Sequence, residues 1–73
     1  MKNFAERLKA CRKKSNLSQQ ETAKLLGIGC TTYRRYEYGD RLPVLDDAAK
    51  MAQLFNVSLD YLAGLTDEPT AVK

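Results

Sequence analysis

The placement of helix-ending residues constrains this chain most, because it divides a helical pattern into short lengths. Apolar residues recur at the three- and four-residue spacing of an α-helix nearly throughout, beginning with Phe4 and Leu8, and no alternating run typical of strands occurs. Three of the helical stretches are followed by glycines, Gly27, Gly39 and Gly64, and glycine readily takes the left-handed conformation that ends a helix. The sequence therefore predicts an all-α chain of short helices.

Signals for helix starts lie between these ends. Ser18 and Glu21 form a capping box, in which each side chain accepts a hydrogen bond from the backbone N–H of the other residue. Other starts are expected at Asn3, at Gly29 or Thr31, just before Asp46 and Asp47, and at Ser58. The fourth helix should place Leu45, Ala48, Ala52 and Phe55 on its inner side. These signals predict five helices, followed by a frayed polar segment, residues 66–73.

The chain offers little for catalysis. Its 73 residues make one small domain with a thin core. Histidine is absent, which removes the usual general base near neutral pH and the commonest metal ligand. Two cysteines cannot complete a four-ligand zinc site, and they are too few for a disulfide framework. We therefore expect a binding module and not an enzyme, with no metal and no cofactor.

The absence of export and membrane signals and the uneven distribution of charge indicate which partners the protein can meet. The sequence lacks the apolar stretch of a signal peptide and the run of about 18–20 apolar residues of a membrane span, so we expect a cytoplasmic protein with reduced thiols and no membrane. Residues 1–14 carry six basic groups against Glu6, whereas residues 46–73 carry a net charge of −3. This dipole would orient the molecule toward a polyanion, although an ordinary solvated surface explains the charges equally well.

Residues 18–38 match a helix-turn-helix, two short helices joined by a tight turn that contains glycine. Gly27 permits the turn, and the small side chain of Ala23 lets the two helices approach closely. The inward positions are expected to be Thr22, Leu26, Ile28, Tyr33 and Tyr36, and the exposed positions of the second helix to be Cys30, Thr31, Arg34, Arg35 and Tyr38. A helix fits the major groove of DNA, where arginine can donate two parallel hydrogen bonds to guanine.

The motifs, taken in order, resemble the Cro and phage-repressor helix-turn-helix family. They are Leu17-Ser18-Gln19-Gln20-Glu21, Ala23, Leu26-Gly27-Ile28, Arg35-Tyr36-Glu37, Gly39, Pro43 and Val57-Ser58-Leu59-Asp60-Tyr61-Leu62. The resemblance covers residues 4–65 and implies a compact five-helix, lambda-repressor-like DNA-binding domain over residues 1–65. It also implies a transcriptional regulator that represses as a dimer on an inverted-repeat operator in double-stranded DNA.

The resemblance also assigns roles by position. The base-reading residues would be Cys30, Thr31, Arg34 and Arg35, the DNA-backbone contacts Gln19, Tyr38 and Arg41, and the internal salt bridge Arg12 with Glu37. Candidates for the dimer interface are Leu42, Val44, Leu59, Leu62 and Leu65, although simple core is the alternative for most of them. Thr22 and Tyr33 depart from the family's aliphatic residues, and the larger ring is expected to fill the space that threonine leaves.

Three questions stay open from the sequence. The same fold serves a DNA-binding antitoxin, whose main partner is a toxin protein, and a protein-interaction adaptor that no longer binds DNA. Cys30 lies at a helix N-terminus near arginines, so its thiol is either a redox switch or, as we expect, a neutral thiol that faces the groove or is half-buried.

Overall fold

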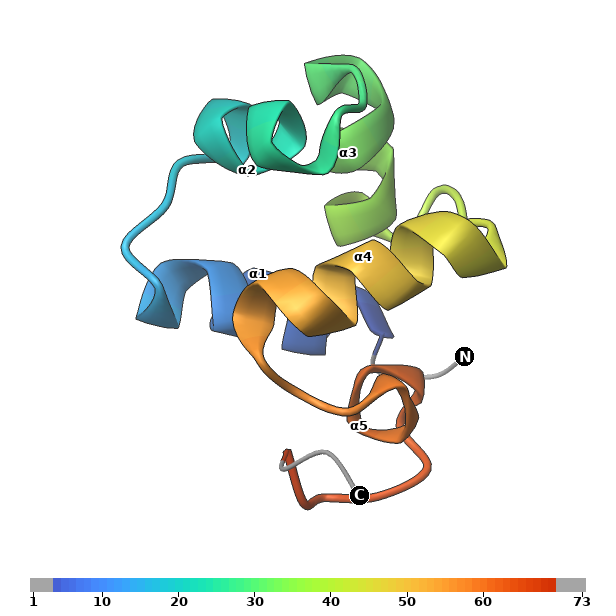
Figure 1. Cartoon of the computed structure of the whole chain (residues 1–73). Helices are drawn as coiled ribbons and strands as arrows, with labels where there is room; N and C mark the ends of the chain where they lie inside the picture. Colours follow the sequence, from blue (N-terminus) through green and yellow to red (C-terminus); the bar gives the residue numbers. More distant parts are fainter. Residues whose placement is uncertain (1–3, 70–73) are drawn as a thin grey trace.

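Five α-helices in the expected order make up the structure, a computed structural model that describes residues 4–69. They are α1 (Phe4–Lys14), α2 (Gln19–Leu26), α3 (Cys30–Tyr38), α4 (Leu45–Phe55) and α5 (Leu59–Ala63). In Figure 1, α2 and α3 lie above α1 and α4, and α5 lies below with the segment that follows it. No strand occurs within residues 4–69, so the all-α prediction is confirmed. None of these helices is long and apolar enough to cross a bilayer.

The predicted capping residues explain where the helices begin and end. Ser18 caps α2 by accepting a hydrogen bond from the Glu21 backbone N–H at 3.0 Å, and the Glu21 carboxylate accepts one from the Ser18 N–H at 2.9 Å. Gly27 ends α2 with a φ of 74°, in the left-handed region that favours glycine. Gly29, and not Thr31, is the N-cap of α3 and supplies no side-chain hydrogen bond. Asn3, the expected cap of the first helix, lies outside the described residues.

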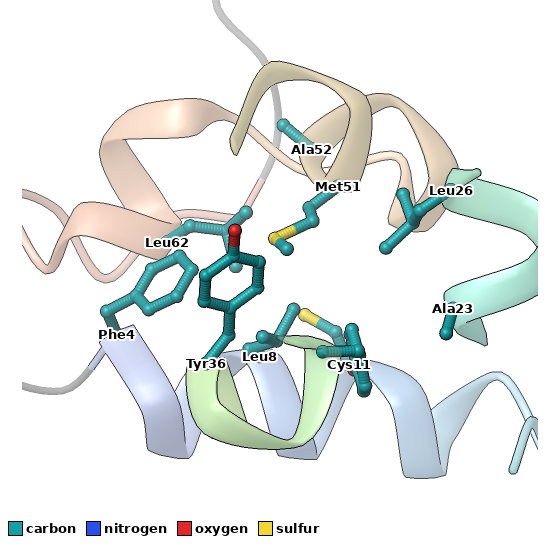
Figure 2. Close-up of a cluster of buried hydrophobic side chains, with 10 residues drawn as sticks. Phe4, Leu8, Cys11, Ala23, Leu26, Tyr36, Met51, Ala52 and Leu62 are labelled. Carbon is teal, nitrogen blue, oxygen red and sulfur yellow. The ribbon is translucent and has the colours of Figure 1, made fainter. Parts of the chain in front are cut away.

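All five helices contribute to one core (Figure 2). The helix α1 lies along one side of it, with Phe4, Leu8 and Cys11 facing inward. The other helices cover this face with Ala23, Leu26, Tyr33, Tyr36, Met51, Ala52 and Leu62. Tyr33 and Thr22 are both fully buried. The expectation that the tyrosine ring fills space left by threonine requires this, because only buried side chains share the volume of the core.

The expected inner face of α4 is wrong at one position and incomplete at another. Leu45 is 72% exposed, because it occupies the first position of the helix, beyond the edge of the core. Met51 is fully buried, since it lies three residues after Ala48 and one before Ala52 on the same face. Leu62, a candidate for the dimer interface, is also fully buried and belongs to the core.

The segment after α5 is not frayed as far as Pro69, contrary to the expectation for residues 66–73. The Ser58 backbone N–H donates to the Pro69 carbonyl at 2.8 Å, and Arg7 pairs with Asp67 at 2.6 Å. Polar composition alone pointed to fraying, but these contacts with distant residues hold the backbone. The remainder of that segment, residues 70–73, lies outside the described residues.

Two leucines test this description of the core. Leu62→Ala should lower the free energy of unfolding by about 2–5 kcal/mol, because it leaves a cavity beneath α5. Leu25→Ala is the matched control, since Leu25 is 61% exposed on α2, and its cost should stay within about 0.5 kcal/mol. Urea unfolding followed by circular dichroism measures both. Equal costs would contradict the placement of Leu62.

Candidate nucleic-acid interface

The helix α3 has two chemically different faces. Its inner face holds Tyr33, Tyr36 and Glu37, which are buried against the rest of the domain. Its exposed positions are Thr31, Arg34, Arg35 and Tyr38. The one acidic side chain of α3 is on the inner face, so the outer face offers only guanidinium, hydroxyl and phenol groups. This is the composition that a helix needs to approach a polyanion.

Cys30 is not one of the exposed positions of α3, although the sequence analysis counted it among them; it takes the half-buried placement that was the other expectation for its thiol. Its side chain is half-buried and packs against the core. The reason is helical spacing: Cys30, Tyr33 and Glu37 are three and four residues apart, so they share the inner face. Thr31, one residue later, is the first position of α3 that faces away from the core. The structure thus places the thiol at the edge of the candidate interface.

The loop between α3 and α4 continues the exposed surface. Arg41 lies in this loop and is exposed. On the inner side of α3, the Tyr36 hydroxyl donates to the Asp47 carboxylate at 3.1 Å, so one hydrogen bond spans the loop from α3 to the first turn of α4. Burial and this carboxylate together raise the pKa of Tyr36. The bond fixes both ends of the segment that carries Arg41.

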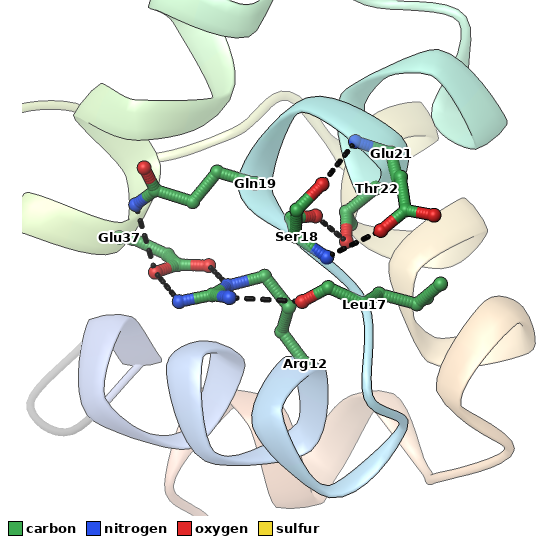
Figure 3. Close-up of polar contacts among 7 residues, drawn as sticks. All are labelled: Arg12, Leu17, Ser18, Gln19, Glu21, Thr22 and Glu37. Atoms are coloured by element: carbon green, nitrogen blue, oxygen red, sulfur yellow. Dashed lines mark hydrogen bonds and ion pairs between the residues drawn. The ribbon is translucent and has the colours of Figure 1, made fainter.

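A buried ion pair joins α1 to α3 (Figure 3). Arg12 Nε donates to Glu37 Oε2 at 2.6 Å and Arg12 Nη2 donates to Oε1 at 3.2 Å, a bidentate geometry. The Glu37 side chain is 0% exposed and that of Arg12 is 12% exposed. These are the two residues that the resemblance pairs, and a third hydrogen bond, from Arg12 Nη1 to the Leu17 carbonyl at 2.9 Å, ties in the turn before α2.

Gln19, the first residue of α2, completes this cluster. Its side-chain amide donates to Glu37 Oε1 at 3.2 Å, and its side chain is half-buried (Figure 3). The amide group has two N–H donors, so this bond leaves one for another acceptor. The sequence expectation gave Gln19 only an outward role. The contact of Gln19 with Glu37 could not be predicted from residue spacing, because it depends on how α2 packs against α3.

The cluster sets the charge state of its members. Burial alone would raise the pKa of Glu37, but hydrogen bonds from Arg12 and the other donors around it, Gln19 included, outweigh burial and lower it. The Glu37 carboxylate in turn raises the pKa of Arg12 by accepting its hydrogen bonds. Burial, assisted by the same carboxylate, raises the pKa of the enclosed Tyr33 hydroxyl. Glu37 is therefore an anion and Arg12 a cation at neutral pH.

Neutralising Glu37 tests how much the Arg12–Glu37 ion pair contributes to the stability of the fold. Glu37→Gln leaves the Arg12 charge without its partner, and the free energy of unfolding should fall by about 3–5 kcal/mol. Because folding lowers the pKa of Glu37, the pair stabilises the wild type above the ordinary carboxyl pKa of 4.5, and this contribution is lost as the pH falls through the folded pKa. The variant should lack that part of the acid sensitivity. Urea unfolding at a series of pH values measures both effects.

The control is Glu6→Gln, which removes an exposed carboxylate from α1. Its unfolding free energy should follow the wild-type curve at each pH. A Glu37→Gln variant as stable as the control would mean that the pair is not buried in solution.

One known protein family matches the sequence over these helices. The family model described as "Helix-turn-helix" matches residues 8–62, which include all of α2 and α3 and the turn between them. No solved structure shows a significant match to the chain.

Curated bacterial relatives agree with the family match. The chain is 49% identical over 59 residues to the HTH-type transcriptional regulator AnsR of Bacillus subtilis, covering 81% of this chain and 51% of the relative. It is 38% identical over 66 residues to the uncharacterized HTH-type transcriptional regulator YobD of the same species, covering 90% and 59%. It is 40% identical over 65 residues to the cryptic phage CTXphi transcriptional repressor RstR of Vibrio cholerae, covering 86% and 58%.

The chain thus spans little more than half the length of these relatives. The match extends over most of the described helices, and the relatives are named as regulators or repressors of transcription. The chain belongs to the helix-turn-helix family of the Cro and phage-repressor type.

Proposed function

We propose that the protein is a sequence-specific regulator of transcription that binds double-stranded DNA and represses by occupying an operator. The observation that supports this most is the outer face of α3, where Thr31, Arg34, Arg35 and Tyr38 are exposed on a helix whose inner face is fixed by a buried ion pair. A helix fits into the major groove, and side chains on its outer face then reach base edges. The relative RstR is itself named as a transcriptional repressor.

The exposed residues divide by their expected targets. Arg35 lies four residues after Thr31 on the same exposed face, at the start of the last turn of α3, and we expect it to make a bidentate contact with guanine. Arg34 and Thr31 complete the base-reading set, with Cys30 at its edge. Tyr38 at the end of α3, Arg41 in the following loop and the free amide N–H of Gln19 are suited to phosphate oxygens.

We further propose that two copies bind an inverted repeat through an apolar face. A groove of about 320 Å³, here named the α4–α5 groove, is lined chiefly by Pro43, Leu45, Leu59, Leu62 and Leu65. Leu42 and Val44, the chain neighbours of Pro43, are also exposed, so several apolar side chains near this groove are open to a partner. Leu45 lines the groove and is 72% exposed, so its side chain is available to pack against the same face of a second copy, as a two-fold interface requires.

The sharpest test separates Arg35 from Arg41 on an operator obtained by selecting bound duplexes from random DNA. Arg35→Ala should lose about 1–3 kcal/mol of discrimination at one base position in each half-site. Arg41→Ala should weaken binding to operator and scrambled duplex alike, and should reduce the log–log salt slope by about 1. Salt titrations of both variants on both duplexes measure these effects.

The two variants control each other, because each removes one positive charge from an exposed arginine. A change of base preference in Arg41→Ala, combined with a pure salt effect in Arg35→Ala, would contradict the placement of α3 in the groove. Absence of any salt-dependent duplex binding would favour the protein-interaction adaptor instead.

The dimer has its own test. Footprinting should show two protected half-sites about 34 Å apart, one turn of the double helix. Leu45→Glu should abolish self-association in sedimentation experiments, because it places a charge in the apolar lining of the α4–α5 groove. Leu25→Glu, at the exposed leucine of α2, is the matched control and should self-associate as the wild type does. One short continuous footprint would show that a single copy binds.

A further inference from the structure

A single arginine on α1 holds the segment that leaves α5. Arg7 Nη1 donates to the Tyr61 carbonyl at 2.7 Å and also to the Thr66 carbonyl, and Nη2 donates to the Asp67 carboxylate at 2.6 Å. The guanidinium carbon lies 4.4 Å from the centre of the Tyr61 ring, over its face. The Arg7 side chain is only 17% exposed although it carries a full charge, so its hydrogen bonds replace most of its hydration.

This segment forms one wall of the α4–α5 groove. Leu65 lines the groove and is 77% exposed, so almost nothing but its backbone determines where its side chain stands. The Leu65 N–H donates to the Asp60 carbonyl at 2.9 Å, and the next residue, Thr66, is bound by Arg7. Further along, the Ser58 N–H holds Pro69. Phe4, one helical turn before Arg7, lines the floor of the same groove.

We propose that Arg7 is a positioning residue for self-association: it fixes Thr66 and thereby holds Leu65 as a wall of the α4–α5 groove, into which a second copy of this chain docks. This inference rests on the proposed function, because it assumes that the groove is the dimer interface. A standard interface buries about 800 Å² per partner, roughly a sixth of the 5000 Å² surface of the described residues. An interface of this size would need the exposed apolar residues that line the groove, Leu45, Leu59 and Leu65, all in place.

The chemistry requires arginine and not merely a positive charge. The planar guanidinium presents five N–H donors in a fixed fork, so it can reach two carbonyls and a carboxylate at once while it stacks on Tyr61. Lysine carries its three N–H donors on one freely rotating nitrogen and has no plane to stack on Tyr61, so it cannot hold both carbonyls, the carboxylate and the ring contact in one fixed geometry. The Asp67 carboxylate is 99% exposed, so the two carbonyl bonds and not the ion pair carry the contact.

The experiment compares Arg7→Lys and Arg7→Gln with Lys9→Gln, which removes an exposed charge from the same helix. Self-association is measured by sedimentation, DNA contact by affinity for a duplex holding one selected half-site, and the segment by hydrogen exchange at the Ser58 amide. Both Arg7 variants should self-associate roughly tenfold more weakly and lose protection at Ser58. Half-site affinity should stay within about twofold, and Lys9→Gln should match the wild type throughout.

Three results would overturn the inference. Wild-type self-association in Arg7→Lys would show that charge suffices. An equal loss of half-site affinity in both Arg7 variants would show that Arg7 supports the whole fold and not the groove. A wild type that stays monomeric even on the full operator would remove the interface itself, while Arg35-dependent half-site binding would show that the DNA-binding function survives. Self-association thus tests the role of Arg7, and half-site binding tests the DNA-binding function, so the two can fail independently.

Discussion

The Glu37 carboxylate is the group on which the rest of the structure depends. An ionised carboxylate with a fully buried side chain is costly unless neighbouring donors replace its water. Here the donors come from two other helices, Arg12 on α1 and Gln19 on α2, while Glu37 itself lies on α3. Arg12 donates to both carboxylate oxygens, and Gln19 adds a second donor to Oε1, so the carboxylate ties α1 and α2 to α3. The ion pair thus selects one arrangement of α1, α2 and α3 over other ways of packing the same apolar residues.

This selection has a direct effect on the exposed side of α3. Once Glu37 and Tyr33 are fixed on the inner face, the helical period determines which side chains point outward. The rotation of α3 about its own axis is therefore set by a buried group that never meets a ligand. The Tyr36–Asp47 bond does the same for the loop that carries Arg41. Together they give the proposed DNA-binding surface a shape that exists before DNA arrives, which reduces the entropy lost on binding.

Local features were predictable from the sequence, and contacts between distant residues were less so. The capping box at Ser18 and the left-handed glycines are signals within a few residues, and they located the helices correctly. Cys30 was misplaced because the inner and outer faces of α3 were divided one residue too early. Leu45 was misplaced because apolar spacing cannot show where the core ends. The contacts of Arg7 with Thr66 and Asp67 join residues about 60 positions apart, and no local pattern announces them.

The helix α1 carries both Arg7 and Arg12, fewer than two turns apart and bound to opposite parts of the molecule. One ties the helix to the segment beside the α4–α5 groove, and the other ties it to α3. A short α-helix held by contacts at both Arg7 and Arg12 is stiff. It therefore forms a rigid connection between the proposed dimer face and the proposed reading helix. In a dimer built this way, the separation of the two reading helices cannot adjust by flexing within a subunit. An operator with different half-site spacing would have to bend or twist instead. The base pairs between the half-sites, which no side chain touches, would then influence affinity through their deformability.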